Sequence, residues 1–238
     1  CGDFDILGNR RPVSYWRESI WSNENVTGIA VQPPVYYGQK VNMTQWGFSD
    51  SVRSWNFSGY EGSPVKVEVY SNAEEVELLL NGVSAGRKKV GETRKNAVYF
   101  DITYEKGTIE AVSFMDGKEA GRDLLETASE DVILKAQADE NYLPADSSDL
   151  IFIDIDLLDK NGILNPEKEI AISVSLEGPG EIIGFGTANP KTEEWFGAKK
   201  AVTYEGKARA GIRATGEGTI RVIFSSEIGD SVVKIQAI

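Results

Sequence analysis

From residue 65 to the end, the chain alternates apolar and polar positions with a period of two. The alternation is clear at 65–70 (VKVEVY), and at 151–159 (IFIDIDLLD) acidic side chains take most of the polar positions. A period of two places every second side chain on one face, as in a strand with one buried face. The pattern predicts a mostly β protein.

The first series of strand-like segments ends near residue 128. Asn81-Gly82 and Asp116-Gly117 separate some of these segments, and such pairs favour tight hairpin turns that need positive φ angles. The spacing predicts an accessory β-sandwich of about six or seven strands over residues 65–128. Its expected strands are 65–70, 75–80, 84–90, 97–103, 108–115 and 118–126.

A second series fills residues 129–238. Seven or eight short strands are typical of an immunoglobulin-like β-sandwich, although the cysteine and tryptophan pattern of antibody domains is missing here. The sequence therefore predicts two consecutive β-sandwich domains. The expected strands of the second are 131–138, 150–158, 169–176, 181–185, 201–204, 207–213, 219–225 and 231–237.

The first 64 residues have a different texture. Pro12 suits the first turn of a helix, and Val13, Trp16 and Ile20 follow at helical spacing. A helix this short is unstable alone, so the 1–21 segment must dock on another part of the protein. Residues 22–64 are irregular but rich in aromatic rings, which predicts a strap pressed against neighbouring surface rather than a flexible linker.

Composition narrows the possible functions. The chain has 238 residues and a net charge of −12 with a pI near 4.6, so binding to nucleic acid or to an anionic membrane surface is disfavoured. Histidine is absent, which removes the most common general base and zinc ligand. The single cysteine, Cys1, allows no internal disulfide. We expect no metal, no cofactor and no membrane span.

Carboxylate pairs are the first candidates for chemistry. Asp154 and Asp156 occupy the polar positions of a predicted strand, and Glu193 and Glu194 lie in a predicted loop. A glycosidase needs two carboxylates across a sugar, with one held protonated by burial. We favour a solvated sheet face for the two aspartates and assign no catalytic residue within the chain. The Gly-rich run that includes Gly184 and Gly186 is interpreted as turns and a bulged strand.

Tryptophans in loops are the second candidates. Sugar rings present apolar C–H faces that stack on aromatic side chains, so Trp46, Trp55 and Trp195 are candidate carbohydrate contacts. The alternative is that these rings anchor the strap and the domains by packing, and we favour packing.

Three stretches carry a resemblance to a known family. Residues 44–62 (TQWGFSDSVRSWNFSGYEG) and 65–82 (VKVEVYSNAEEVELLLNG) resemble the region after the catalytic barrel of bacterial glycoside hydrolase family 2 enzymes of the β-galactosidase type. Residues 5–18 (DILGNRRPVSYWRE) are similar to the last loop and helix of that barrel, and 176–190 (LEGPGEIIGFGTANP) to the C-terminal immunoglobulin-like domain.

The resemblance implies a domain order. Residues 1–21 would be the tail of a (β/α)8 barrel, 22–64 the strap, 65–128 the accessory sandwich and 129–238 the immunoglobulin-like sandwich. The loop at 186–190 departs slightly from the family pattern, but Asn189 is a candidate carbohydrate contact. The catalytic glutamates of the family lie on earlier barrel strands, so the resemblance places none in this chain.

The resemblance implies the non-catalytic C-terminal part of a retaining glycosidase that acts on β-galactosides or related β-glycosides. The chain would brace the barrel and the active-site rim, with the barrel of the same polypeptide as its partner and a homo-oligomer as a further expectation. The alternative is a carbohydrate-binding module that uses loop tryptophans. Substrate, linkage and compartment stay open, with a periplasmic or secreted location favoured over a cytoplasmic one.

Overall fold

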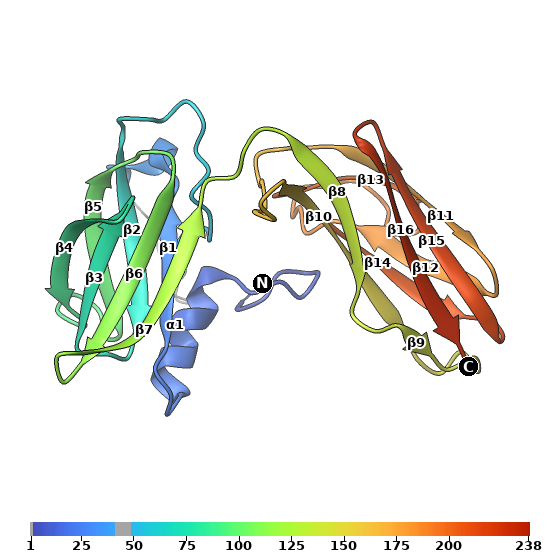
Figure 1. Ribbon diagram of the computed structural model, residues 1–238, viewed down its shortest axis with the longest axis horizontal. Coiled ribbons are helices and arrows are strands. Elements are labelled where there is room, and N and C mark those ends of the chain that lie inside the picture. The colour runs from blue at the N-terminus through green and yellow to red at the C-terminus, as the bar shows by residue number, and fades with distance from the viewer. Residues whose placement is uncertain (1, 41–48) are drawn as a thin grey trace. The chain divides into compact units, whose positions relative to one another are not determined.

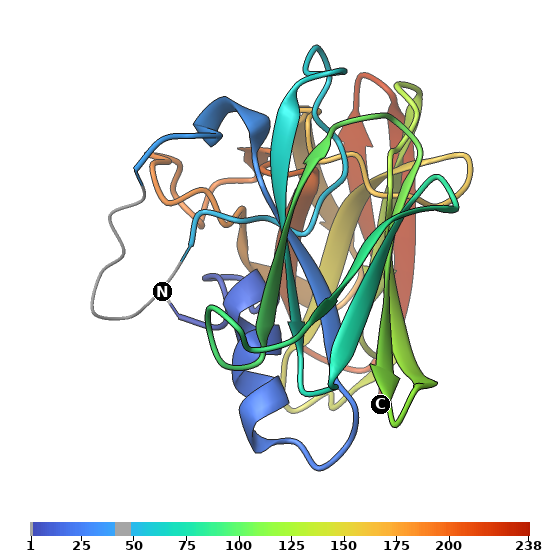
Figure 2. The ribbon, with the colours of Figure 1, turned by 90° about the vertical axis from the view of Figure 1, so that its left-hand side faces the viewer.

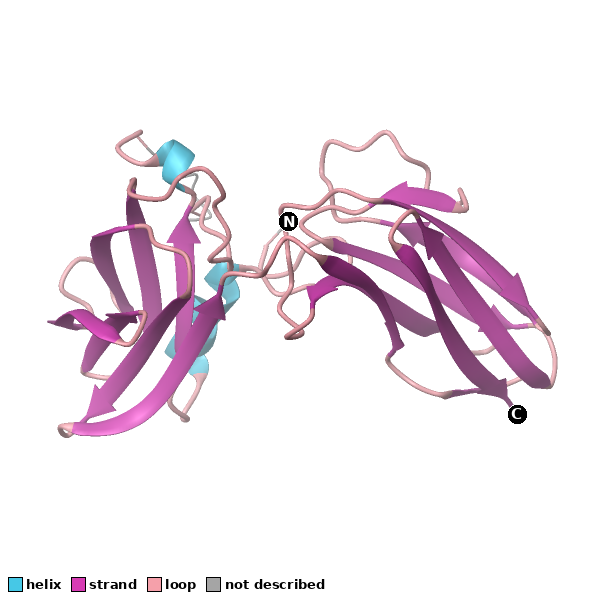
Figure 3. Ribbon diagram, turned by 45° about the horizontal axis from the view of Figure 1, so that its top comes forward, coloured by secondary structure: helices cyan, strands magenta, loops and turns pink. Residues whose placement is uncertain are grey.

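The computed structural model describes residues 2–40 and 49–238 and consists mainly of antiparallel strands (Figures 1 and 3). The chain divides into two compact units, Cys1–Thr127 and Ala128–Ile238. The predicted β-sandwich fold class is confirmed in both units. The barrel-tail segment, the strap and the accessory sandwich, which were predicted as separate parts, all lie within the first unit.

Two sheets form the first unit. One is three-stranded with the order β1-β2-β5, and the other is four-stranded with the order β4-β3-β6-β7. Their inner faces enclose a core of aliphatic and aromatic side chains from both sheets and from the strap. The strands are β1 (Thr27–Gln32), β2 (Pro64–Ser71), β3 (Glu75–Leu80), β4 (Val83–Lys89), β5 (Ala97–Thr103), β6 (Thr108–Met115) and β7 (Lys118–Glu126).

Tight turns join these strands as the sequence predicts. Asn81 and Gly82 have φ angles of 50° and 78°, and Asp116 and Gly117 have 50° and 73°. Both residues of each pair therefore adopt the left-handed conformation that a two-residue type I′ hairpin requires. The first turn sets the pairing of β3 with β4 where these strands meet it, and the second does the same for β6 and β7.

Strand β1 corrects the interpretation of residues 22–64 as wholly irregular. It pairs antiparallel with β2 from Thr27 opposite Ser71 to Gln32 opposite Lys66. Nearly every position of β1 is buried, because one face meets the core and the other meets a helix. Apolar residues on both faces leave no alternation to detect, and this is why the period-two pattern missed the strand.

Helix α1 (Pro12–Trp21) is the helix expected from Pro12, Val13, Trp16 and Ile20. It packs on β1 and β2, against the face of the sheet that points away from the core. The short 3-10 helix η1 (Pro34–Tyr36) follows β1, and Figure 2 shows α1 and η1 on the same side of the first unit. At ten residues α1 is far too short to cross a bilayer, and no other helix in the described part of the chain reaches the necessary length.

The second unit is also a two-sheet sandwich. Its sheets are four-stranded, in the order β12-β14-β10-β8, and five-stranded, in the order β13-β11-β15-β16-β9. One continuous core lies between them and includes the rings of Phe185 and Phe224. The strands are β8 (Val132–Ala138), β9 (Tyr142–Leu143), β10 (Ile151–Asp159), β11 (Ala171–Glu177), β12 (Gly180–Gly186), β13 (Lys200–Val202), β14 (Lys207–Ala214), β15 (Gly218–Ser226) and β16 (Gly229–Ala237).

Two details of this unit bear on the sequence predictions. The register between β12 and β14 shifts between Ile182 and Gly184, which confirms the bulged strand predicted from the glycines. Strand β9 was not predicted, because two residues in parallel pairing with β16 are too few to show a period.

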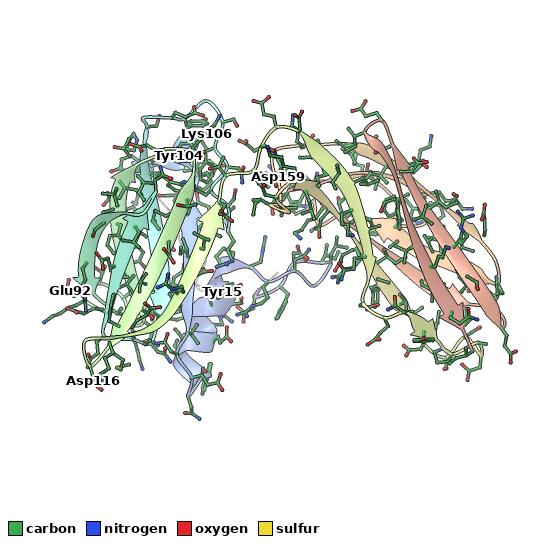
Figure 4. The ribbon with its side chains drawn as sticks, viewed as in Figure 1. Tyr15, Glu92, Tyr104, Lys106, Asp116 and Asp159 are labelled. Carbon is green, nitrogen blue, oxygen red and sulfur yellow. The ribbon has the colours of Figure 1, made fainter. Side chains whose placement is uncertain are left out.

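A turn in the second unit is organised by Asp159. Its Oδ1 accepts hydrogen bonds from the backbone nitrogens of Asn161 (2.8 Å) and Ile163 (3.0 Å). Its Oδ2 accepts from the nitrogen (2.9 Å) and hydroxyl (3.3 Å) of Ser129. The N–H groups of Ser129 and Ile163 stabilise the carboxylate and hold the pKa of Asp159 below its ordinary value. Figure 4 labels this residue close to the start of β8.

This arrangement predicts a loss of stability in acid. Because the native pKa of Asp159 is lowered, its stabilising contribution is complete above the unfolded pKa of about 3.9 and is lost as pH falls through the native pKa. Urea unfolding of the chain, followed from neutral to acid pH, measures this loss. Asp159→Asn should lower the unfolding midpoint at neutral pH and flatten its decline in acid, and a decline of unchanged steepness would contradict the assignment.

Candidate functional site

Trp55, a predicted carbohydrate contact, lies in the core of the first unit. Its exposed fraction is 0%, and its Nε1 donates a hydrogen bond to the carbonyl oxygen of Glu105 at 2.9 Å. The ring has no free face on which a sugar could stack, so the prediction that Trp55 contacts carbohydrate is wrong. Trp55 instead packs in the core, which was the favoured alternative. Trp46 lies outside the described residues.

Trp55 and two neighbouring aromatic rings form a cluster at one end of the sandwich. The centroid of Trp55 lies 4.9 Å from that of Tyr104 and 6.2 Å from that of Phe57, and Phe57 lies 5.5 Å from Tyr104, all edge to face. The Tyr104 hydroxyl accepts from the nitrogen of Phe57 and donates to the carbonyl oxygen of Trp55. Figure 4 labels Tyr104 at this end. At these rings the strap enters the core, which is a closer association than the predicted packing against neighbouring surface.

Trp195 and Asn189, the other two predicted contacts, share the loop between β12 and β13. Trp195 is 76% exposed, and its ring lies against Gly197, where an added Cβ would come within 2.3 Å of a ring atom. Asn189 is half-buried, and its Oδ1 accepts a hydrogen bond from the nitrogen of Lys191 at 2.9 Å. The Trp195 ring is therefore largely in solvent, and it contacts the backbone of the loop at Gly197.

The same loop is anchored to the sandwich on both sides of Trp195. The carbonyl oxygen of Phe196 accepts from the nitrogen of Phe185 at 2.7 Å, and the Phe196 ring covers Gly186. The Oε1 of Glu194 accepts from the nitrogen of Val202 at 3.1 Å. These contacts give Glu194 a structural task and fix the base from which Trp195 projects.

The aspartate row of β10 is neutralised across the sheet. Asp154 lies opposite Arg209 with an ion pair of 2.6 Å, and Asp156 lies opposite Lys207 with one of 2.8 Å. Cross-strand pairs of this kind stabilise the polar face of an antiparallel sheet. The favoured interpretation of a solvated sheet face fits these contacts. Within residues 2–40 and 49–238, no three acidic, histidine or cysteine side chains form a group that could hold a metal ion.

The structure shows a cation–π arrangement on α1 that sequence reasoning missed. The guanidinium of Arg10 lies 4.0 Å and that of Arg53 4.4 Å from the ring centre of Tyr15, so two cations contact one ring. Tyr15 also rests on Gly28 of β1, where a Cβ would come within 2.7 Å of the ring. Only glycine leaves room for the helix to approach the strand this closely. Figure 4 shows Tyr15 on α1 beside the strands.

Arg53 continues this arrangement into the second sheet of the sandwich. It forms a two-pronged ion pair with Asp123 of β7, at 2.6 and 3.0 Å, and it donates to the carbonyl oxygen of Ile29. The Oδ2 of Asp123 also accepts from the nitrogen of Ile29 at 2.7 Å. Burial by itself lowers the pKa of Arg53. The hydrogen bond and the charge of Asp123 raise that pKa, and together with the smaller effect of Tyr15 they outweigh burial, so the net shift is upward. The strap, β1 and β7 thus meet at one ion pair.

A second polar group is buried between α1, the strap and the outer face of β2. Glu68 is almost fully buried, and its Oε2 accepts hydrogen bonds from the hydroxyls of Tyr70 and Ser49. Burial first, and the charge of Glu68 second, raise the pKa of both Tyr70 and the neighbouring Tyr99. Both phenols therefore stay protonated, and the Tyr70 hydroxyl serves as a donor to the buried carboxylate of Glu68.

The helix end is also tied to the sandwich through the β4–β5 connection. The indole nitrogen of Trp16 donates to the carbonyl oxygen of Lys95 at 2.7 Å, and the ring of Trp16 lies under the guanidinium of Arg94. Asn96 donates to the carbonyl oxygen of Ser19 at 2.7 Å, which satisfies a carbonyl in the last turn of α1. These contacts to the β4–β5 connection, together with packing on β1 and β2, hold the helix on the sandwich of the first unit.

Large apolar side chains nevertheless remain in solvent near this helix. Trp21, at the end of α1, is 84% exposed. The other exposed apolar side chains in the first 40 residues are Phe4, Ile6, Val35, Tyr36 and Tyr37. Large apolar side chains that face solvent in the first 40 residues indicate a surface for another protein part.

Comparison with known proteins gives a match for each unit. Residues 134–232 match the family described as Glycoside hydrolase family 2 C-terminal domain 5. Residues 62–121 match the family described as Domain of unknown function (DUF4982). The two matches fall in the second and first unit, respectively.

Relatives extend the match over almost the whole chain. Beta-galactosidase BoGH2A of Bacteroides ovatus is 28% identical over 98% of this chain and 27% of its own length. A beta-glucuronidase of Formosa agariphila is 25% identical over 72% of this chain and 17% of its own length. The crystal structure of a glycosyl hydrolase family 2 member from Bacteroides cellulosilyticus is 37% identical, with a TM-score of 0.94 over 100% of this chain and 32% of that one.

The chain thus spans about a third or less of the length of these relatives. Both β-sandwiches lie in the region that the sequence resemblance indicated. The relatives that match this region are glycosidases or glycoside hydrolase family 2 proteins. The chain thus corresponds to the C-terminal region of glycoside hydrolase family 2 proteins, and residues 134–232 match a C-terminal domain of that family.

Proposed function

We propose that this chain is the non-catalytic C-terminal part of a retaining glycosidase that acts on β-galactosides or related β-glycosides. The names of its relatives, beta-galactosidase and beta-glucuronidase, support the glycosidase class. Retaining hydrolysis proceeds through a covalent glycosyl-enzyme and needs a nucleophile and an acid/base carboxyl group. In this proposal both groups belong to a catalytic barrel, and the present chain positions that barrel.

The observation that carries the proposal is the set of exposed apolar side chains on α1, on the segment before it and on η1. Trp21 faces solvent although α1, which bears it, is firmly held on the first sandwich, and Phe4 and Ile6, in the segment before the helix, are exposed as well. Figure 2 shows η1, which bears Tyr36, on the same side of that unit. An apolar surface on a rigid support is suited to bracing a large partner, and the proposed partner is the barrel of the same polypeptide.

Quenching of Trp21 fluorescence tests this bracing role. In the present chain, acrylamide should reach Trp21 freely, and the difference between the chain and its Trp21→Phe variant isolates that signal. In a polypeptide that carries a family 2 barrel before residue 1, the barrel covers Trp21 and the Trp21 signal becomes resistant to quenching. Equal quenching of Trp21 in both proteins would contradict the bracing role.

A second candidate function is carbohydrate binding by the loop of the second unit. One observation favours it: Trp195 projects from an anchored loop with one ring face in solvent. That face offers a stacking surface for the C–H side of a pyranose, and the Asn189 amide lies in the same loop as a partner for a sugar hydroxyl.

A calorimetric titration of the chain with β-galactosides and plant oligosaccharides tests this candidate. If Trp195 binds sugar, Trp195→Ala abolishes the binding heat. Trp21→Ala, which removes another largely exposed tryptophan from the other unit, leaves it unchanged. Absence of binding by the unaltered chain across the panel would eliminate the candidate and leave the bracing role alone.

A further inference from the structure

Two exposed turns contain the same dipeptide, Asn-Gly, in different surroundings. In such a pair, the backbone nitrogen of the glycine can attack the asparagine carboxamide, because glycine has no side chain to block the approach. The reaction needs a free carboxamide and a backbone that can bring the two atoms together. The pairs Asn81-Gly82 and Asn161-Gly162 differ in whether the asparagine carboxamide is free.

The carboxamide of Asn81 is fixed at both ends. Its Oδ1 accepts from the nitrogen of Thr108 at 2.8 Å, and its Nδ2 donates to the carbonyl oxygen of Lys106 at 3.1 Å. The group also sits against Gly107, where an added Cβ would lie 2.0 Å from Oδ1. Rotation of this side chain toward Gly82 would break both hydrogen bonds.

The carboxamide of Asn161 has no such restraint. The residue is exposed, and its side chain forms no hydrogen bond within residues 2–40 and 49–238. Its backbone nitrogen is held by Asp159, and the nitrogen of Gly162 donates to the carbonyl oxygen of Asp159 at 2.9 Å. That single backbone hydrogen bond is the contact that must open before Gly162 can attack.

We infer that Asn161 is a site of spontaneous deamidation and that Asn81 is protected from it. The nitrogen of Gly162 forms a bond to Cγ of Asn161, and the Cγ–Nδ2 bond breaks. Ammonia leaves with the proton from the Gly162 nitrogen, and a cyclic succinimide remains. Water then opens the ring at either carbonyl to give aspartate or isoaspartate. This inference does not depend on the proposed function.

The product would disturb the Asp159 turn. Either product places a new negative charge two residues from the Asp159 carboxylate, and isoaspartate also inserts a methylene into the backbone. Oδ1 of Asp159 accepts from the nitrogens of Asn161 and Ile163, so a longer backbone between these residues displaces its donors. Modification should therefore lower the melting temperature of the second unit.

The experiment is incubation of the full chain at mildly alkaline pH, followed by peptide mapping with mass spectrometry. A parallel sample in urea removes the structural difference, and there both sites should react to a similar extent. In the folded chain, deamidation at Asn161 should exceed that at Asn81 by about tenfold, the effect expected when Asn81 must break one more hydrogen bond. Asn161→Gln should abolish the product peptide and the accompanying drift in melting temperature.

Asn81→Gln is the matched control and should leave the rate at Asn161 unchanged. Equal reaction at the two sites in the folded chain, or faster reaction at Asn81, would overturn the inference. So would an unmodified Asn161 in the folded chain after the urea sample has been converted.

Discussion

Trp55→Ala should destabilise the first unit by about 3–5 kcal/mol, the range for removing a large buried aromatic side chain. The indole fills the end of the core between Tyr104 and Phe57, and its exposed fraction is 0%. Truncation leaves a cavity and an unpaired carbonyl at Glu105, which loses its hydrogen bond from Nε1. Urea unfolding followed by circular dichroism measures the change.

Two further variants make this prediction specific. Trp55→Phe keeps an aromatic ring but removes the hydrogen bond to Glu105, so it should cost less than Trp55→Ala. Trp21→Ala removes a tryptophan that is 84% exposed and should change the unfolding midpoint very little. A small effect of Trp55→Ala, similar to that of Trp21→Ala, would show that the strap is not part of the core.

Asp123→Ala should cost about 2–4 kcal/mol, somewhat below the range for breaking a fully buried ion pair because both side chains keep some exposure. The substitution leaves the Arg53 guanidinium without its carboxylate and removes the acceptor of the Ile29 nitrogen. Because Arg53 also contacts the Tyr15 ring, the loss should loosen α1 as well. Hydrogen exchange of the α1 amides measures this second effect.

The first unit contains a matched control for this ion pair. Asp101 pairs with Lys66 at 3.5 Å, and both side chains are well exposed. Asp101→Ala should therefore change stability by less than about 1 kcal/mol, as is usual for surface pairs. Equal effects of Asp123→Ala and Asp101→Ala would contradict the role assigned to the Arg53–Asp123 pair.

Local signals explain why much of the fold could be predicted. The strands at 75–80, 97–103, 108–115 and 118–126 were predicted with the bounds that the structure shows, because period-two alternation and tight turns act over neighbouring residues. The helix begins at Pro12, where the sequence placed its first turn. The bulge near Gly184 follows from glycines in a strand pattern.

The features that were missed depend on residues far apart in the sequence. Tyr15, Gly28, Arg53 and Asp123 meet only after the helix, the strap and two sheets have assembled, so no spacing rule connects them. Trp55 and Trp195 look alike in sequence, as tryptophans in irregular segments. The first is buried because the strap enters the core, whereas the second projects from an anchored loop.

The most direct test of the account is a hydrolysis assay with the purified chain. We predict no release of nitrophenol from nitrophenyl β-galactoside or nitrophenyl β-glucuronide beyond that of a buffer blank, because the catalytic carboxyl groups are assigned to the barrel. Turnover that co-purifies with the chain, and that falls when Asp154, Asp156 or Glu193 is replaced by its amide, would contradict the central claim that this part of the protein acts by packing and not by chemistry.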